Sequence, residues 1–161
     1  MPIYMGIFDK PNVLSKDFKG EVKAAGYEGW IELQSAQVGM SRPIGATDGR
    51  STDRENAAPT LHEIVVSKHM DSSSTALFKE AVSGKGRLIV IAFVKGDGTA
   101  YLKVVLQSAM ISSYTISGDP PIEQYSLNFT KITYEAAEKS PNTTHAQMHQ
   151  LSQQGSWDSY P

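Results

Sequence analysis

The segment from residue 123 to residue 134 carries an apolar pattern that one straight strand cannot hold. In its first part apolar side chains alternate with polar ones, at Tyr125, Leu127 and Phe129, which predicts a strand with one apolar face. After residue 130 the apolar side chains move to even positions, at Ile132 and Tyr134. Because neighbouring residues of a strand point to opposite faces, this shift by one position predicts a bulge or a bend.

Six more segments are rich in β-branched or aromatic residues and are bounded by Gly, Pro, Asp or Ser, which predicts strands. They comprise residues 3–8, 30–38, 61–69, 87–95, 99–108 and 109–117. A hairpin is predicted at Lys95-Gly96-Asp97-Gly98-Thr99, since both glycines can adopt a positive φ at little cost.

One helix is predicted after the polar run that begins at Asp71. The side chains of Asp71, Ser72 and Ser73 can accept hydrogen bonds from the amides of the first turn. Gly84 is placed to end the helix in the left-handed conformation. Seven strands beside one short helix indicate a mainly β protein. We therefore expect a single domain, residues 1–161, folded as a β-barrel of two packed antiparallel sheets with one flanking α-helix.

The composition excludes several kinds of chemistry and of partner. The chain has 161 residues, a net charge of −2 and no cysteine, so disulfides and thiolate sites are impossible. Lys and Arg are scattered, so no nucleic acid is expected as a partner. The start lacks the basic and apolar parts of a secretory signal, and the longest apolar run, residues 88–94, is too short to cross a bilayer. We expect synthesis in the cytoplasm and no membrane insertion.

Three groups of residues could suggest metal binding or catalysis, and each has a simpler interpretation. His145 and His149 stand four residues apart, but the segment lacks the glutamate of a zinc protease, which favours a solvated polar tail. His69 and Asp71 with a neighbouring serine could suggest a serine hydrolase, yet there is no nucleophile elbow. The glycines of residues 45–50 lack the Gly-Lys-Ser/Thr of a phosphate-binding loop. We expect no catalytic residue, no metal site and no cofactor.

Residues 88–94 are apolar without alternation, so both faces of this strand should be covered. One face would meet the core. The other would lie either under the helix of residues 73–82 or against another subunit. In the second case the interface candidates are Ile89, Ile91 and Phe93.

Two stretches carry no regular pattern. Residues 42–60 are rich in Gly, Ser, Thr, Asp and Pro, and so long an aperiodic stretch in a compact domain is usually functional or disordered. From residue 135 to residue 161 the chain reads as a polar tail that is poor in aliphatic residues, with two aromatic residues near its end.

Four blocks of the sequence resemble, in the right order, those of the Hcp family, the tube protein of bacterial type VI secretion systems. They are Gly29-Trp30-Ile31-Glu32-Leu33 with Gly39-Met40-Ser41-Arg42-Pro43, the strand–Asp–Ser–helix–Gly unit of residues 64–84, the strand pair of residues 106–114 with Ile111-Ser112-Ser113-Tyr114, and Glu123-Gln124-Tyr125-Ser126-Leu127-Asn128-Phe129-Thr130-Lys131-Ile132. The family often carries an aromatic residue where this chain has Val38.

The resemblance implies a homohexameric ring with a wide channel, and rings that stack into an expelled tube. The implied partners are further copies of the chain, the spike, sheath and baseplate proteins, and small effector proteins, with secretion that needs no signal peptide. Candidates for the ring interface or for stacking are Arg42, Ile44, Asp48 and Arg50, besides the three residues of the apolar strand.

The channel wall should be the part of the barrel that the helix does not cover, and Ser113 and Ser117 are the candidates for effector contact. Two readings from other classes stay open. One is a monomeric ligand-binding or glycan-binding β-sandwich, and the other is a secreted serine hydrolase that uses His69.

Overall fold

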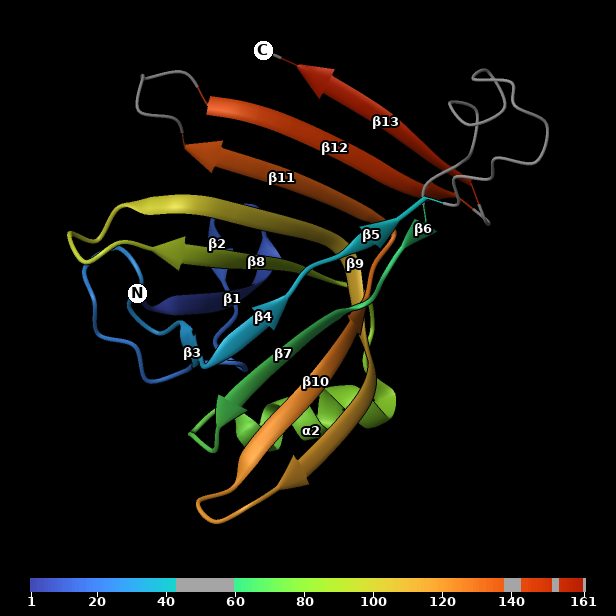
Figure 1. Ribbon diagram of the computed structural model, residues 1–161. Coiled ribbons are helices and arrows are strands. Elements are labelled where there is room, and N and C mark those ends of the chain that lie inside the picture. The colour runs from blue at the N-terminus through green and yellow to red at the C-terminus, as the bar shows by residue number, and fades with distance from the viewer. Residues whose placement is uncertain (43–59, 138–142, 152–153, 161) are drawn as a thin grey trace.

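The computed structural model describes residues 1–42, 60–137, 143–151 and 154–160, and side chains for residues 1–42 and 60–136. In this part of the chain, the strands form two antiparallel layers, and the helix flanks the second of them (Figure 1). These layers match the predicted pair of packed antiparallel sheets with one helix.

The first sheet contains both chain ends. Its strands are β1 (Ile3–Lys10), β2 (Val13–Leu14), β3 (Ile31–Leu33), β8 (Arg87–Val94), the first half of β9 (Ala100–Ser117), β11 (Lys131–Ala137), β12 (Thr143–Leu151) and β13 (Gln154–Tyr160). The second sheet is formed by β4 (Ser35–Gln37), β7 (Ile64–His69), β10 (Ile122–Asn128) and the second half of β9. A small ribbon pairs β5 (Met40–Ser41), which precedes residues 43–59, with β6 (Thr60–Leu61), which follows them.

Strand β9 crosses from the first sheet to the second. Its first half pairs with β8 and β11, and its second half pairs with β10. At the crossing Ser108 has a φ of 51°, a value that few non-glycine residues adopt. Gly86 leaves room for this bend, because a Cβ there would lie 3.0 Å from the Ser108 Cα. The two strands predicted over residues 99–117 are therefore one strand that serves both sheets.

The phase change of residues 123–134 has the same origin. We predicted a bulge or bend in one strand, but the structure has two strands, β10 and β11, separated by Phe129 and Thr130. They pair with different halves of β9, so the chain changes sheet between them. Each strand keeps its own alternation, and the shift arises because the two sheets face the core from opposite sides.

A second crossing occurs at Gln34. Strand β3 pairs with β1 in the first sheet, and β4 pairs with β7 in the second. The predicted strand over residues 30–38 is thus split. The backbone amide of Gln34 donates to the carbonyl of Ser67 at 2.7 Å. This hydrogen bond ties the chain to β7 at the point where it enters the second sheet.

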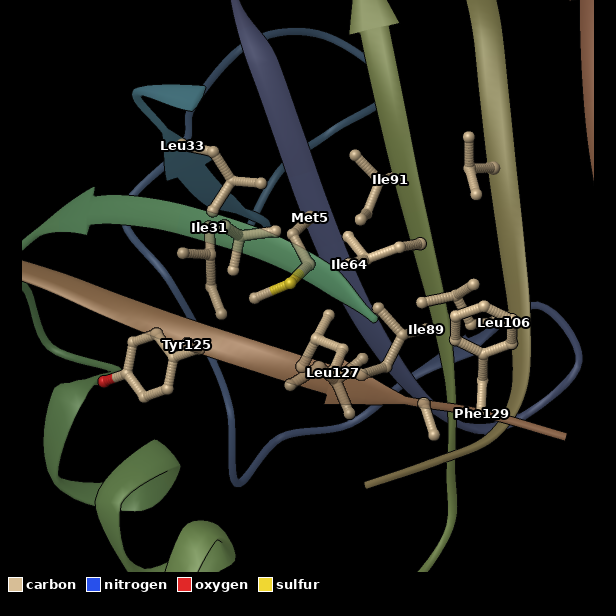
Figure 2. Close-up of a cluster of buried hydrophobic side chains, with 14 of the residues drawn as sticks. Met5, Ile31, Leu33, Ile64, Ile89, Ile91, Leu106, Tyr125, Leu127 and Phe129 are labelled. Carbon is tan, nitrogen blue, oxygen red and sulfur yellow. The ribbon is translucent and has the colours of Figure 1, made fainter. Parts of the chain in front are cut away.

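The hydrophobic core lies between the two sheets (Figure 2). The first sheet contributes aliphatic side chains such as Met5, Ile31 and Leu106, and the second contributes Ile64 and Leu127, all 2% exposed or less. Full burial of an aliphatic side chain contributes about 1.5–3 kcal/mol. Their removal from water therefore drives the sheets together.

Both faces of β8 are covered by the chain itself. Ile89 and Ile91 are 2% and 0% exposed and belong to the core between the sheets. On the other face Ala92 and Val94 pack in a separate cluster with Tyr4 and Tyr27. The predicted cover by the helix is wrong, because the N-terminal segment occupies that place. Burial within one chain also removes Ile89 and Ile91 as contacts for another subunit.

The polar tail is strand rather than solvated coil. Strand β11 continues to Ala137, and β12 and β13 then extend the first sheet beyond the body (Figure 1). His145 and His149 both lie on β12, where four residues span about 13 Å. They do not share a helical face, so the spacing that suggested a metal pair has no such meaning here.

The helix α2 (Ser74–Ser83) packs against the second sheet, with Leu77 buried in the core. Its predicted position is confirmed, but its ends differ from the prediction. Ser73 makes no side-chain cap hydrogen bond; Asp71 Oδ1 instead accepts from the Ser73 amide at 2.8 Å. Gly84 is extended, with a φ of −76° and a ψ of 163°, so it is not needed for a left-handed turn. It is needed for space, because a Cβ there would lie 2.3 Å from the Glu80 carbonyl oxygen.

Replacing Gly84 with alanine should therefore lower the free energy of unfolding by about 1–3 kcal/mol, as overpacking does. The clash is with helix backbone, which cannot turn aside. Urea unfolding would measure the change. The control is Gly96→Ala in the hairpin, where an added Cβ meets no heavy atom within 4 Å; it should change stability by about 0.5 kcal/mol or less. Equal losses in the two variants would contradict the account.

Candidate functional site: an uncharged strand face over a buried ion cluster

One face of the second sheet points away from the core and from α2, and we call it the outer face. Side chains directly opposite each other in a ladder share a face, so the register defines its members. They are Ser35, Gln37, Val65, Ser67, His69, Met110, Ser113, Thr115, Ser117, Ile122, Gln124, Ser126 and Asn128. Within this set there is no Lys, Arg, Asp or Glu, and most members are small and polar.

The two predicted channel residues both lie on the outer face. Ser113 is opposite Ser126, and Ser117 is opposite Ile122. Both serines are exposed, on the side of the sheet that α2 does not cover. A bulge at Ser112 turns that side chain towards Glu63 at the edge, to which its hydroxyl donates at 2.8 Å.

The alternate residues of the same strands point inward and form an ion cluster. Lys68 is fully buried, and its ammonium nitrogen lies 3.0 Å from Glu123 Oε2 and 2.9 Å from Asp71 Oδ1. It also donates to the His69 carbonyl and to the Ser74 hydroxyl. A buried charge is tolerated only when its lost hydration is replaced, and four oxygen atoms replace it here.

Glu123 is the main hydrogen-bond acceptor of this cluster. Its Oε2 receives hydrogen bonds from Lys68, from the Ser74 hydroxyl and from the Tyr125 hydroxyl, each at 3.0 Å. Burial, and then the contact with Glu123, raises the pKa of Tyr125 well above its ordinary value of 10, so the phenol stays protonated and donates. The cluster thereby joins β7, β10 and the first turn of α2 behind the outer face.

Sequence reasoning missed this cluster, although a signal was present. Lys68 stands in phase with the apolar residues Ile64 and Val66, and Glu123 stands in phase with Tyr125 and Leu127. Opposite charges that occupy inward positions of two strands indicate a buried pair. The pairing of β7 with β10 was not known from the sequence, and it is this pairing that puts Lys68 opposite Glu123.

The candidates for ring contact are placed as follows. Ile89 and Ile91 lie inside the core, and Phe93 is only partly buried at its edge. Arg42 is exposed beside β5. Ile44, Asp48 and Arg50 lie outside the described residues.

His69 forms no hydrogen bond with the three serines that follow it, which were its predicted hydrolase partners. The ring of His69 contacts Gln34, whereas the hydroxyls of Ser72, Ser73 and Ser74 donate to Lys19, Asp71 and Glu123 respectively. His69 is on the outer face, and Asp71 is bound to the inward Lys68. In the part of the chain that the structure describes, no group of three His, Asp or Glu side chains could hold a metal ion.

Replacing Lys68 with methionine should lower the free energy of unfolding by about 3–5 kcal/mol, because the buried carboxylate of Glu123 and the partly buried carboxylate of Asp71 would lose their cation. Chemical denaturation at neutral pH would measure the loss. Lys79→Met, on the exposed side of α2, is the matched control and should change stability by about 0.5 kcal/mol or less. A loss for the Lys68 variant no larger than that of the control would show that the cluster is dispensable.

The comparisons with known proteins agree with this architecture. The family model described as "Type VI secretion system effector, Hcp" matches residues 5–135. A solved type six secretion system protein has a TM-score of 0.79 at 18% identity, over 96% of this chain and 99% of its own. Hcp1 from Salmonella typhimurium has a TM-score of 0.74 at 18% identity, over 96% and 97% of the two chains. Hcp1 from E. coli EAEC 042 has a TM-score of 0.71 at 20% identity, over 90% and 96%.

At such identities the solved structures show the fold, and the family model shows the membership. No curated protein sequence matches the chain. Among the described residues, no helix has the length and apolar character needed to cross a membrane. The chain belongs to the Hcp family and is a tube subunit of a type VI secretion system.

Proposed function

We propose that six copies of the chain close into a ring, that rings stack into a hollow tube, and that small effector proteins travel in the channel. The observation that carries this proposal is the outer face of the second sheet. Most of its side chains carry hydroxyl or amide groups, three are apolar (Val65, Met110 and Ile122), and the face extends over four strands.

Such a face suits the wall of a channel. Binding pockets for one small ligand are concave and mostly apolar, whereas this face is a sheet of hydroxyl and amide groups. It carries no large apolar patch that would make an empty channel aggregate. The Glu63 carboxylate at its edge accepts hydrogen bonds from Ser112 and Asn128, and the face itself has no Lys, Arg, Asp or Glu. We therefore propose that effectors of different net charge can enter.

The ring contacts must come from surfaces other than the core of β8. On the helix side Phe78 and Val82 are 51% and 73% exposed, and Ile116 beside them on β9 is 45% exposed. We propose that a neighbouring copy covers these apolar side chains. Because a closed ring uses a heterologous contact, they would meet a different surface of that neighbour. Phe93 and the segment from Arg42 through Ile44, Asp48 and Arg50 remain proposed contacts for the ring or for stacking.

The proposed partners are further copies of the chain, effectors, and the spike, sheath and baseplate proteins of the secretion system. Synthesis in the cytoplasm and export without a signal peptide are part of the proposal, as is the absence of enzymatic activity. The last point is supported by the hydrogen bonds of His69 and of the three serine hydroxyls, all of which go to other partners. The glycan-binding alternative would need aromatic residues around a cleft, and the hollow beside the chain start has none in its lining.

Light scattering coupled to size-exclusion chromatography should give a mass about six times that of the 17.5 kDa chain. A dilution series is needed, because a ring held by modest contacts dissociates at low concentration. A single-chain mass at every concentration would contradict the ring and favour the monomeric sandwich.

Replacing Ser117 with glutamine should weaken effector retention by about tenfold, equivalent to about 1.4 kcal/mol, and leave the ring mass unchanged. The larger side chain would project from the outer face into the space that cargo occupies. The fraction of a small effector that elutes with the ring measures the effect. Ser83→Gln, exposed at the end of α2 away from the outer face, is the control and should retain effector normally. Equal retention in the two variants would remove Ser117 from the channel wall.

A further inference from the structure

The outer face contains one group that changes charge near neutral pH, the imidazole of His69. The other members of the face carry hydroxyl, amide or apolar side chains, which do not ionise in this range. Histidine is the side chain whose charge changes between pH 5 and pH 8. His69 is exposed at the end of β7, opposite Ile122 of β10. It is therefore the member of the outer face through which pH can alter the charge of the proposed channel wall.

The surroundings of His69 suit either charge state. Its ring contacts the side-chain amide of Gln34, and in the described part of the chain it forms no ion pair. An amide can donate through its nitrogen to a neutral imidazole, or accept through its oxygen from a protonated one. A half-turn of the Gln34 amide thus keeps the contact when His69 gains a proton.

The charged groups near His69 come from several parts of the chain. A hollow of about 610 Å³ opens beside it, and the ionisable groups in its lining are the amino group at Met1 and the carboxylates of Glu21, Glu32 and Asp71. Asp119 lies in the turn between β9 and β10, at the same end of the second sheet (Figure 1). On the inward side Lys68 and Glu123 pair with each other.

This end of the outer face is acidic while His69 is neutral. Glu21, Glu32 and Asp119 are exposed, and none of them forms an ion pair with a described residue. Asp71 is bound by Lys68, which also serves Glu123. The lysines that flank Glu21 in the sequence, at positions 19 and 23, do not line the hollow. Protonation of His69 therefore adds a positive charge where negative charges predominate.

His69 also lies level with a residue already predicted to contact cargo. The ladder places His69 opposite Ile122, and Ile122 opposite Ser117. The three side chains form one row across β7, β10 and β9. Cargo that contacts Ser117 would therefore be close to the group that changes charge.

We infer that His69 makes the retention of cargo depend on pH, an inference that rests on the proposed ring and channel. Effectors that present Lys or Arg to this end of the wall are retained at neutral pH and released on acidification, because attraction is lost and like charges are added. In a closed ring the six copies of a residue lie at one level, so the charge appears all around the channel. Cargo that contacts several copies responds to each of them, which exceeds the effect of one exposed pair.

Peptide binding to the assembled ring tests the inference. The probe is a Gly/Ser peptide that contains several arginines and a neutral fluorophore, and fluorescence anisotropy gives its Kd at about pH 7.5 and about pH 5.5. Arginine keeps its charge at both values. We expect the ring to bind this peptide about fivefold more weakly at the lower pH. A peptide with glutamine in place of each arginine should bind more weakly and without this change.

Three variants assign the effect to one side chain. His69→Gln retains a polar group beside Gln34 but cannot ionise, so its ring should bind the arginine peptide equally at both pH values. His69→Lys is charged at both, so at neutral pH it should bind as weakly as the unchanged protein does at low pH. His62→Gln is the matched control. His62 is an exposed histidine that bonds to Ser41 and is not a member of the outer face, so its removal should leave the pH response intact.

A loss of affinity on acidification that persists in the His69→Gln ring would overturn the inference. So would a neutral-pH affinity for the arginine peptide no higher than that for the glutamine peptide. Light scattering on the same samples separates this failure from that of the proposed function. Rings of six that show no dependence on His69 refute the inference alone, whereas single chains at both pH values refute the ring as well. A ring that dissociates only at low pH would place the pH dependence in subunit contacts, which also overturns the inference.

Discussion

A buried ammonium group is stable only where other atoms replace its water, and for Lys68 three parts of the fold do so. Glu123 comes from β10, Asp71 from the turn after β7, and Ser74 from the first turn of α2. Removing any of them would leave a charge or a hydroxyl without its partner in the interior. The position of the helix on the second sheet is therefore fixed by a polar contact, in addition to the burial of Leu77.

The rigidity behind the outer face matters for a tube wall. In β7 the inward Lys68 alternates with the outward Ser67 and His69, and in β10 the inward Glu123 alternates with Gln124. Lys68 and Glu123 are paired on the inner side, whereas the outer side carries mostly hydroxyl and amide groups, with the Glu63 carboxylate at its edge. Because successive side chains of a strand point to opposite faces, the same two strands supply the ion pair on the inner face and the mostly neutral side chains of the outer face.

Much of the local structure could be predicted, and the errors share one cause. Strands β1 and β8 lie where the β-branched and aromatic residues predicted them, and the helix follows the polar run from Asp71 as predicted. The split of residues 123–134 into two strands and the fusion of residues 99–117 into one were missed, because each depends on which sheet the chain joins. The positions of the apolar residues indicate that the buried face of the chain changes near residue 130. They do not indicate whether a bulge within one strand or a move to the other sheet causes the change. The strands at the chain end were missed because their composition is polar and their pairing is with β11.

The sequence by itself determined the mainly β class, the helix after Asp71, the lack of thiol chemistry and the resemblance to the Hcp family, because these follow from residue types and short-range order. That Ser113 and Ser117 line a channel stays a prediction. Only the tertiary structure decided that Lys68 meets Glu123 and that Ile89 and Ile91 are core. These relations join residues far apart in the chain, and they depend on strand pairing, which no local pattern specifies.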